Sequence, residues 1–160
     1  MGLDRPPGDK LSCSIPMKLA CTLALALLGV AGSLNAEKKI IQPKEIAPGA
    51  PFSPGVLVDG TLYVAGQTGR DLKTGKVPDN FEDEVKATLE TIGIILREAK
   101  MNYSDVVSVQ VYLTDISLFQ RMNAVYLTYF KTDRPTRTTV GVAALAGAGA
   151  HIEITVTAHH

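Results

Sequence analysis

The chain has 160 residues, and its 16 Lys and Arg residues balance its 16 Asp and Glu residues, so the formal net charge at neutral pH is zero. This length fits one domain with one hydrophobic core. The balanced charge, without any run of Lys and Arg, argues against a protein that wraps nucleic acid, because neutralising phosphates requires a concentrated basic surface.

Residues 1–36 are typical of an export signal that follows a short extension. Met17-Lys18 opens an apolar run, Leu19 to Val30, and small residues follow between Ala31 and Ala36, where a signal peptidase could cut. The run is shorter than the roughly 20 apolar residues of a membrane-spanning helix. We therefore expect an exported protein, periplasmic in location, with membrane contact only through this leader. A leader that does not function would leave the protein in the cytoplasm.

Residues 37–54 are rich in Pro and Gly and are predicted to be a lead-in arm, and residues 55–160 are predicted to form the domain itself. The domain opens with two short β-branched and aromatic segments, Val56–Val58 and Thr61–Ala65. Asp59-Gly60 lies between them, and this dipeptide readily adopts the positive φ angles of a tight hairpin turn. Two antiparallel strands are therefore expected here, the second ending at Gly66–Gly69.

A long helix is predicted to begin near Phe81. Apolar residues recur at steps of three and four, the spacing of one helical face: Phe81, Val85, Leu89, Ile92, Leu96 and Ala99. Charged residues take the other face: Glu82, Glu84, Lys86, Glu90 and Arg97. Such a helix packs its apolar face on a sheet and turns its charged face away.

The second half of the domain alternates strands and a helix. Asp105–Leu113 is predicted to be a central strand, a second helix to begin near Ser117 and stop before Arg134-Pro135, and Arg137–Leu145 and His151–Ala158 to be the last strands. This order predicts the α+β class, with two helices packed on one face of a mixed sheet. The other face would remain fairly apolar, and oligomerisation is the usual way to cover it.

Motifs for several common chemistries are incomplete or missing. Gly69–Lys76 has neither the spacing nor the Ser/Thr of a phosphate-binding loop, and Gly147–Gly149 leads into a strand where a dinucleotide fingerprint requires a helix. Cys13 and Cys21 both lie in the leader, so the mature domain has no thiol nucleophile. The chain has only three histidines, which makes a zinc site or a Ser-His triad improbable: His151, His159 and His160.

Four blocks occur in order along residues 51–158: Leu62–Gln67, Asp105–Asp115, Met122–Tyr126, and Arg134–Val140 with Ile152–Ile154. Together they resemble the Rid family, also called the YjgF or L-PSP family. The resemblance implies a chorismate-mutase-like fold and a homotrimer with clefts between neighbouring subunits. It also implies hydrolysis of reactive imines or enamines, such as 2-aminoacrylate and its imino acid tautomer, to 2-keto acids and ammonia. No cofactor or metal is implied, and the expected partners are a small carboxylate-bearing substrate and other copies of the chain, not nucleic acid.

The resemblance implies two catalytic residues. Arg137 matches the arginine that holds the substrate carboxylate, and a guanidinium suits this role because it offers two parallel donors. Glu153 matches the glutamate that activates the attacking water, and its place between Ile152 and Ile154 turns it away from both side chains in a strand. The alternatives are a surface salt bridge for Arg137, and pairing of Glu153 with Arg137 or a Lys.

The resemblance implies six further residues that border the substrate: Gly66, Asn123, Tyr126, Thr139, Phe52 and Ala65. Phe52 and Ala65 depart from the common pattern, because many deaminating members have Tyr and Ser at these positions. Thr139 replaces a frequent Cys, and its carbonyl could still position water. Tyr126 could equally belong to the core, and Gly66 could simply end a strand with a bend.

The sequence thus predicts a hydrolytic imine deaminase in which Arg137 fixes the substrate and Glu153 activates water. The principal alternative is a non-catalytic trimer that binds small carboxylates or a protein partner, which fits both the missing hydroxyls and the export signal. An endoribonuclease, a name attached to some family members, has less support. The domain shows neither an internal pair of histidines nor a basic stripe.

Overall fold

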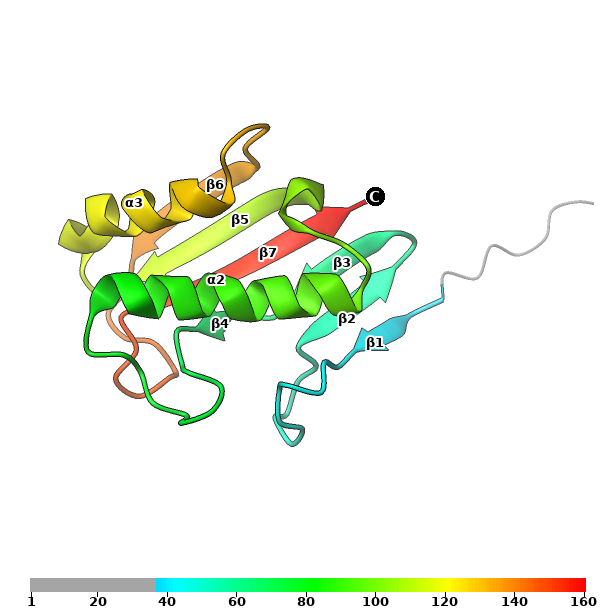
Figure 1. The fold of residues 1–160 in the computed structure, drawn as a ribbon, viewed down its shortest axis with the longest axis horizontal. Coiled ribbons are helices and arrows are strands. Elements are labelled where there is room, and N and C mark those ends of the chain that lie inside the picture. The colour runs from blue at the N-terminus through cyan, green and yellow to red at the C-terminus, as the bar shows by residue number, and fades with distance from the viewer. Residues whose placement is uncertain (1–36) are drawn as a thin grey trace, which may run out of the picture. The chain divides into compact units, whose positions relative to one another are not determined.

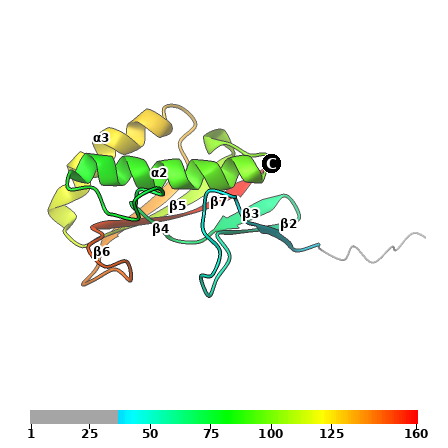
Figure 2. The same cartoon turned by 60° about the horizontal axis from the view of Figure 1, so that its bottom comes forward.

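The computed structural model describes residues 37–160. Two helices, α2 (Phe81–Glu98) and α3 (Phe119–Tyr129), cover one face of a mixed sheet (Figure 1, Figure 2). This arrangement confirms the predicted α+β class. The predicted leader and both cysteines lie outside the described residues. Within residues 37–160, no helix is both long enough and apolar enough to cross a membrane.

The sheet has seven strands. In chain order they are β1 (Lys39–Ile41), β2 (Gly55–Val58), β3 (Thr61–Val64), β4 (Gln67–Thr68), β5 (Val106–Leu113), β6 (Thr136–Gly141) and β7 (Ile152–His159). Their spatial order is β1-β2-β3-β7-β5-β6, and β4 pairs with β7. Only β5 and β6 run parallel, because α3 carries the chain back between them. The strand that carries Glu153 is therefore central.

The hairpin between β2 and β3 has the predicted turn. Asp59 and Gly60 have φ angles of 47° and 73°, and two such left-handed residues match the twist of the flanking strands. The strand β1, in contrast, falls within the predicted lead-in arm, where it pairs with β2. A strand of three residues that is soon followed by Pro43 is too short to show a period in the sequence.

The sheet is interrupted after β3. Gln67 and Thr68 do not end the second strand, as the sequence predicts, but form the separate strand β4 against β7. The N–H of Ala65 donates to the carbonyl oxygen of Pro54 at 2.9 Å and so continues the pairing with β2, whereas the pairing of β3 with β7 stops at Tyr63. The hydroxyl of Thr155 on β7 donates to the carbonyl oxygen of Val64 at this break. The interruption therefore lies beside Glu153, which pairs with Thr68.

The strand β6 ends four residues before its predicted end at Leu145. Its last residue, Gly141, pairs with Leu113, the last residue of β5, so no partner remains for a longer strand. The N–H of Val142 makes one more bond to the carbonyl oxygen of Leu113 at 2.8 Å. The loop 142–151 then leads to β7. It lies on the side of the sheet opposite the helices (Figure 2).

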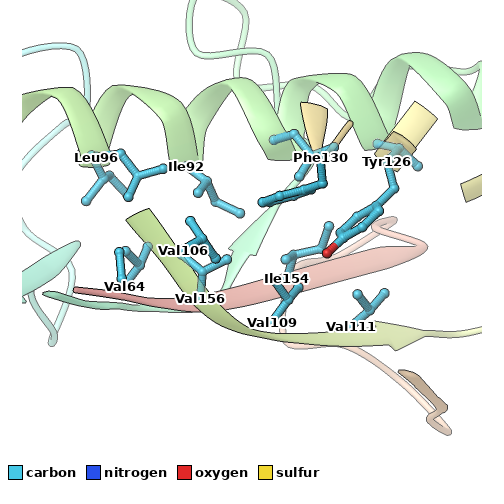
Figure 3. Packing of buried hydrophobic residues seen from close by; sticks show 14 of the residues in the cluster. Val64, Ile92, Leu96, Val106, Val109, Val111, Tyr126, Phe130, Ile154 and Val156 are labelled. Atoms are coloured by element: carbon cyan, nitrogen blue, oxygen red, sulfur yellow. The ribbon is translucent and has the colours of Figure 1, made fainter. Parts of the chain in front are cut away.

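The core lies between the two helices and the sheet (Figure 3). Leu89, Ile92 and Leu96 on the predicted apolar face of α2 are fully buried. They share one cluster with the residues of β5 and β7 that point toward the helices: Val109, Val111, Ile154 and Val156. The predicted helical and strand periods are thus both confirmed, because each buries one face in the same core.

The prediction for Glu84 is wrong. Its position in the helical period places it with the charged residues, yet its side chain is fully buried. The start of β7 and the residues after β4 pack against the first turn of α2, so this end of the charged face is covered. Lys86, Glu90 and Arg97 on the same face are exposed, as predicted.

The sheet face opposite the helices carries exposed apolar side chains. Tyr63 on β3, Val107 on β5 and Val140 on β6 are 55, 49 and 40 % exposed. Thr155 and Thr157 of β7 also point to this side, because they alternate with buried residues. We call this surface the open face. An apolar surface of this kind typically contacts a partner.

Candidate functional site

The central strand β7 presents Glu153 on the open face. Ile152 and Ile154 on either side of it are fully buried under the helices, and Glu153 is half-buried. This alternation confirms the predicted direction of the side chain. Glu153 pairs with Thr68 on one side and Tyr112 on the other, so its backbone is fixed from both directions.

Gly66 leaves room for the Glu153 carboxylate. A methyl group at residue 66 would lie 2.9 Å from Cδ of Glu153 and 3.2 Å from its Cγ, and it would overlap Oε1. The backbone of Gly66 is not in the left-handed region, so glycine is needed here for close approach and not for an unusual φ angle. Gly66 also lies at the break between β3 and β4, which agrees with the alternative interpretation that it ends a strand with a bend.

Two hollows flank the Glu153 carboxylate. One, of about 370 Å³, lies between Phe52, Ala65 and the loop at Ala146-Gly147. The other, of about 320 Å³, lies between Tyr112 and the same loop. Phe52 is 59 % exposed, so its ring is available to a ligand or to another protein chain. The predicted residues Phe52, Ala65 and Gly66 therefore gather around Glu153.

A larger cavity, of about 570 Å³, adjoins the first hollow and lies mainly between the arm 46–54 and the residues after β4. Two of its polar side chains, Gln67 and Arg70, already have partners. The amide of Gln67 donates to the carbonyl oxygen of Ala65, and the Arg70 guanidinium donates to the carbonyl oxygens of Gly75 and Ala148. This cavity contains neither Glu153 nor Arg137, so we place the candidate chemistry in the hollows around Glu153.

Arg137 lies on the other side of the sheet. It pairs with Val109, which is buried under the helices, so its side chain leaves the edge strand β6 toward α3. There its guanidinium carbon lies 4.5 Å from the ring centre of Tyr126 and 5.6 Å from that of Phe119. Contact with an aromatic face stabilises a cation by about 0.5–1 kcal/mol at exposed sites. The two rings therefore hold the guanidinium in a fixed orientation.

Two hydroxyls near Arg137 have no hydrogen-bond partner among residues 37–160: those of Tyr126 and Thr139. Thr139 points to the same side as Arg137, because it lies two residues further along β6. Tyr126 is only 3 % exposed and belongs to the core, and its hydroxyl points toward the sheet (Figure 3). Burial raises the pKa of Tyr126, and the positive charge of Arg137 opposes part of that rise. Asn123, one helical turn earlier on α3, is half-buried.

The two predicted catalytic residues thus lie on opposite faces of the sheet. Tyr112 pairs with both Glu153 and Val140, so Glu153 shares the open face with Val140. Arg137 is three residues from Val140 and points to the opposite side, because side chains alternate along a strand. Among residues 37–160, no ion pair joins Arg137 to Glu153. The two side chains of one subunit cannot contact the same small substrate.

The family model described as Endoribonuclease L-PSP matches residues 42–160. The chain belongs to the Rid family. A human relative named 2-iminobutanoate/2-iminopropanoate deaminase is 42 % identical over 115 residues, which cover 70 % of this chain and 83 % of the human protein.

Two solved structures are similar in fold to this Rid protein. One is a Rid family protein from Yersinia pestis, with a TM-score of 0.74 and 31 % identity, covering 78 % of this chain and 100 % of that one. The other is E. coli TdcF with bound serine, with a TM-score of 0.71 and 31 % identity, covering 76 % of this chain and 98 % of that one.

In this Rid protein, the predicted residues form two groups. Gly66, Phe52 and Ala65 surround Glu153 on the open face, whereas Asn123, Tyr126 and Thr139 lie with Arg137 on the helix side. Phe119, which contacts the Arg137 guanidinium, has no distinct signal in the sequence. Among residues 37–160, no three His, Cys, Asp or Glu side chains are grouped so that they could hold a metal ion.

Proposed function

We propose that this protein hydrolyses imino acids to 2-keto acids and ammonia at a site shared by two copies of the chain. The observation that carries the proposal is the placement of Arg137 and Glu153 on opposite faces of one sheet. Two groups that must meet around one small molecule, but cannot meet within a subunit, can meet only across an interface. The human relative supports the reaction by its name, and TdcF, with its bound serine, supports an amino-acid-like ligand.

A homotrimer would supply that interface. The open face carries the exposed apolar side chains of Tyr63, Val107 and Val140 and would be covered by neighbouring subunits, as cyclic symmetry allows. The edge strand β6, with Arg137 beside α3, would then approach the Glu153 of the next subunit. Each trimer would contain equivalent clefts, each with an arginine from one chain and a glutamate from the other.

The substrate carboxylate would bind Arg137, whose guanidinium can donate two parallel hydrogen bonds. The rings of Tyr126 and Phe119 hold the guanidinium in place, and the partnerless hydroxyls of Tyr126 and Thr139 lie beside it. Fixing the carboxylate brings the imine carbon to a defined position opposite Glu153. Because the hydrolysis of an imine is intrinsically easy, positioning supplies most of the rate.

Glu153 of the neighbouring subunit would act as the general base. A water oxygen bonds to the imine carbon while Glu153 takes a proton from that water, and the C=N electron pair moves to nitrogen. Glu153 returns the proton to nitrogen, which gives a carbinolamine. The hydroxyl proton then passes through Glu153 to nitrogen. The C–N bond breaks as the C=O bond forms, so that ammonia departs and a 2-keto acid remains. The carbonyl of Thr139 would help to hold the water.

Mixed trimers test the shared site directly. Arg137→Ala and Glu153→Ala should each be inactive, measured as keto-acid formation above background from imino acids that an amino-acid oxidase generates in the assay. Co-refolding the two variants in equal amounts should restore about a quarter of the wild-type activity, because one site in four then has both intact residues. Each variant refolded alone is the control. Mixed trimers that stay inactive would contradict a shared site, and an active Arg137→Ala protein would reject the arginine assignment.

A trimer that binds carboxylates without turnover is the second candidate. The observation that favours it is that Phe52 and Ala65 line the hollow beside Glu153 and offer no hydroxyl to a ligand. Calorimetric binding of a 2-keto acid that depends on Arg137, together with no acceleration of imine hydrolysis, would identify this function. Binding together with turnover would exclude it.

A further inference from the structure

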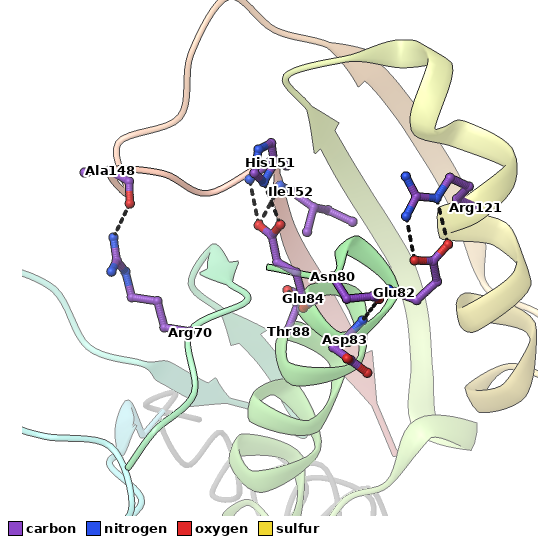
Figure 4. Close-up of polar contacts among 10 residues, drawn as sticks. All are labelled: Arg70, Asn80, Glu82, Asp83, Glu84, Thr88, Arg121, Ala148, His151 and Ile152. Carbon is purple, nitrogen blue, oxygen red and sulfur yellow. Dashed lines mark hydrogen bonds and ion pairs between the residues drawn. The ribbon is translucent and has the colours of Figure 1, made fainter. Parts of the chain in front are cut away.

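A fully buried carboxylate, Glu84, lies at the first turn of α2 (Figure 4). Its Oε1 accepts hydrogen bonds from the backbone N–H groups of His151 at 2.6 Å and Ile152 at 3.2 Å. Its Oε2 lies 2.9 Å from Nδ1 of the exposed His151 ring. A buried carboxylate is tolerated only where its oxygens accept such bonds. Glu84 is therefore a structural partner of one short backbone segment.

That segment is the start of β7. The carbonyl oxygen of His151 accepts from the N–H of Thr114 at 3.0 Å, and Ile152 begins the ladder with β5 opposite Leu113. Glu153 is the next residue. The Glu84 carboxylate thus bonds the two peptide groups immediately before the proposed general base, at the point where the chain leaves the loop 142–151 and enters the sheet.

Glu84 is itself held tightly from two sides. Gly69, just after β4, packs so closely on Glu84 that a methyl group there would overlap both its carbonyl oxygen and its side chain. That carbonyl oxygen also accepts a hydrogen bond from the hydroxyl of Thr88 at 2.9 Å. The neighbouring Arg70 donates to the carbonyl oxygen of Ala148 at 2.7 Å, a second bond to the loop before β7 (Figure 4). Close packing and a hydrogen bond therefore restrain the part of Glu84 that carries the carboxylate.

We propose that Glu84 is a positioning residue, which fixes the start of β7 and thereby the place of the Glu153 carboxylate in the active site. The inference rests on the proposed function, since it assigns Glu84 a part in that same reaction. Glu84 contacts no substrate. Its effect should appear in the chemical step, which Glu153 carries out, and much less in substrate binding, which Arg137 provides from the other subunit.

Three substitutions of Glu84 distinguish the effects of its side-chain length, its charge and its hydrogen bonds. Glu84→Gln keeps an acceptor oxygen at the same distance and removes the charge. Glu84→Asp keeps the charge but is one methylene shorter, so it can reach the two N–H groups only if β7 shifts. Glu84→Met fills the site and accepts no hydrogen bond. Glu82→Gln is the matched control, because Glu82 lies two residues away and pairs with Arg121 instead of β7.

We expect kcat to fall by about 10–100-fold in Glu84→Met, because a displacement of about 1 Å at a reacting group has an effect of this size. Glu84→Asp should lose kcat to an intermediate extent, and Glu84→Gln should stay within about 3-fold of wild type. KM and the affinity for a 2-keto acid product should change by less than about 3-fold in all three. Glu82→Gln should match wild type in every measurement.

Several outcomes would overturn the inference. A kcat that is unchanged in Glu84→Met, or that falls in Glu84→Gln but not in Glu84→Asp, would contradict it. Either result would show that the position of Glu153 does not depend on the hydrogen bonds that Glu84 accepts. If Glu84→Met does not fold, hydrogen exchange of the wild-type protein is the alternative test. The backbone amide of His151 should exchange slowly, because it donates to Glu84. Rapid exchange of this amide would contradict the inference. A wild-type protein without deaminase activity would instead refute the proposed function.

Discussion

Replacing Gly66 by Ala tests whether the Glu153 carboxylate takes part in the chemistry. The added methyl group would lie 2.9 Å from Cδ of Glu153 and 3.2 Å from its Cγ, closer than ordinary contact, and would overlap Oε1. The carboxylate must then move by about 1 Å, because carbon atoms pack at about 3.5–4 Å. A shift of this size should lower kcat by about 10–100-fold. The free energy of unfolding should change by less than about 1 kcal/mol, since the backbone at residue 66 accepts Ala.

The assay follows keto-acid formation from enzymatically generated imino acids, with kcat and KM measured separately. Gly141→Ala is the control, because the nearest side-chain atom to its methyl group would be Cβ of Ile116 at 3.6 Å, an ordinary contact. An unchanged kcat in Gly66→Ala would refute the placement of Glu153 at the reacting carbon. A raised KM with unchanged kcat would show that the backbone of Gly66 binds the substrate instead.

Two further predictions concern assembly and stability. Val140→Asp should prevent trimer formation in sedimentation velocity, because it places an unpartnered charge in the proposed interface. The same change at the exposed Leu127 of α3 should leave the trimer intact. A trimeric Val140→Asp protein would contradict the proposed interface. Two hydrogen bonds from Arg121 hold the pKa of Glu82 at about 2, below its ordinary value of 4.5, so the stability that Glu82 contributes is present above pH 4.5 and lost as the pH falls toward 2. The difference in free energy of unfolding between wild type and Glu82→Gln, measured with urea, should therefore be larger at pH 7 than at pH 2. A difference as large at pH 2 as at pH 7 would contradict this.

Most helices and strands of this protein can be predicted from local patterns. The apolar steps of α2 and the alternation of β7 each bury one face, and Asp59-Gly60 forms the expected turn. Such patterns depend on residues that are close in the chain. The strand β1 and the break after β3 could not be predicted in this way, because each depends on hydrogen bonds to another strand, β2 for β1 and β7 for the break.

Glu84 marks the limit of periodicity as a guide to burial. The helical period places it with Lys86 and Glu90 on the charged face, and those two residues are exposed. Glu84 differs only because β7, more than sixty residues later in the chain, begins against its carboxylate. Its burial is decided by which backbone N–H groups the fold brings to it, and the sequence around Glu84 contains no sign of them.

The sequence by itself determined the class of fold, the family resemblance and the direction of Glu153 relative to its two neighbours. These follow from alternation and order along one segment. Whether Arg137 shares a face with Glu153 depends on how β6 and β7 are each aligned with β5, and a shift of one residue in either pairing would reverse the answer. Only the tertiary structure fixes that register, because the hydrogen bonds that set it join strands distant in sequence. It places the two residues on opposite faces, and on this placement rests the proposal that the active site is shared between subunits.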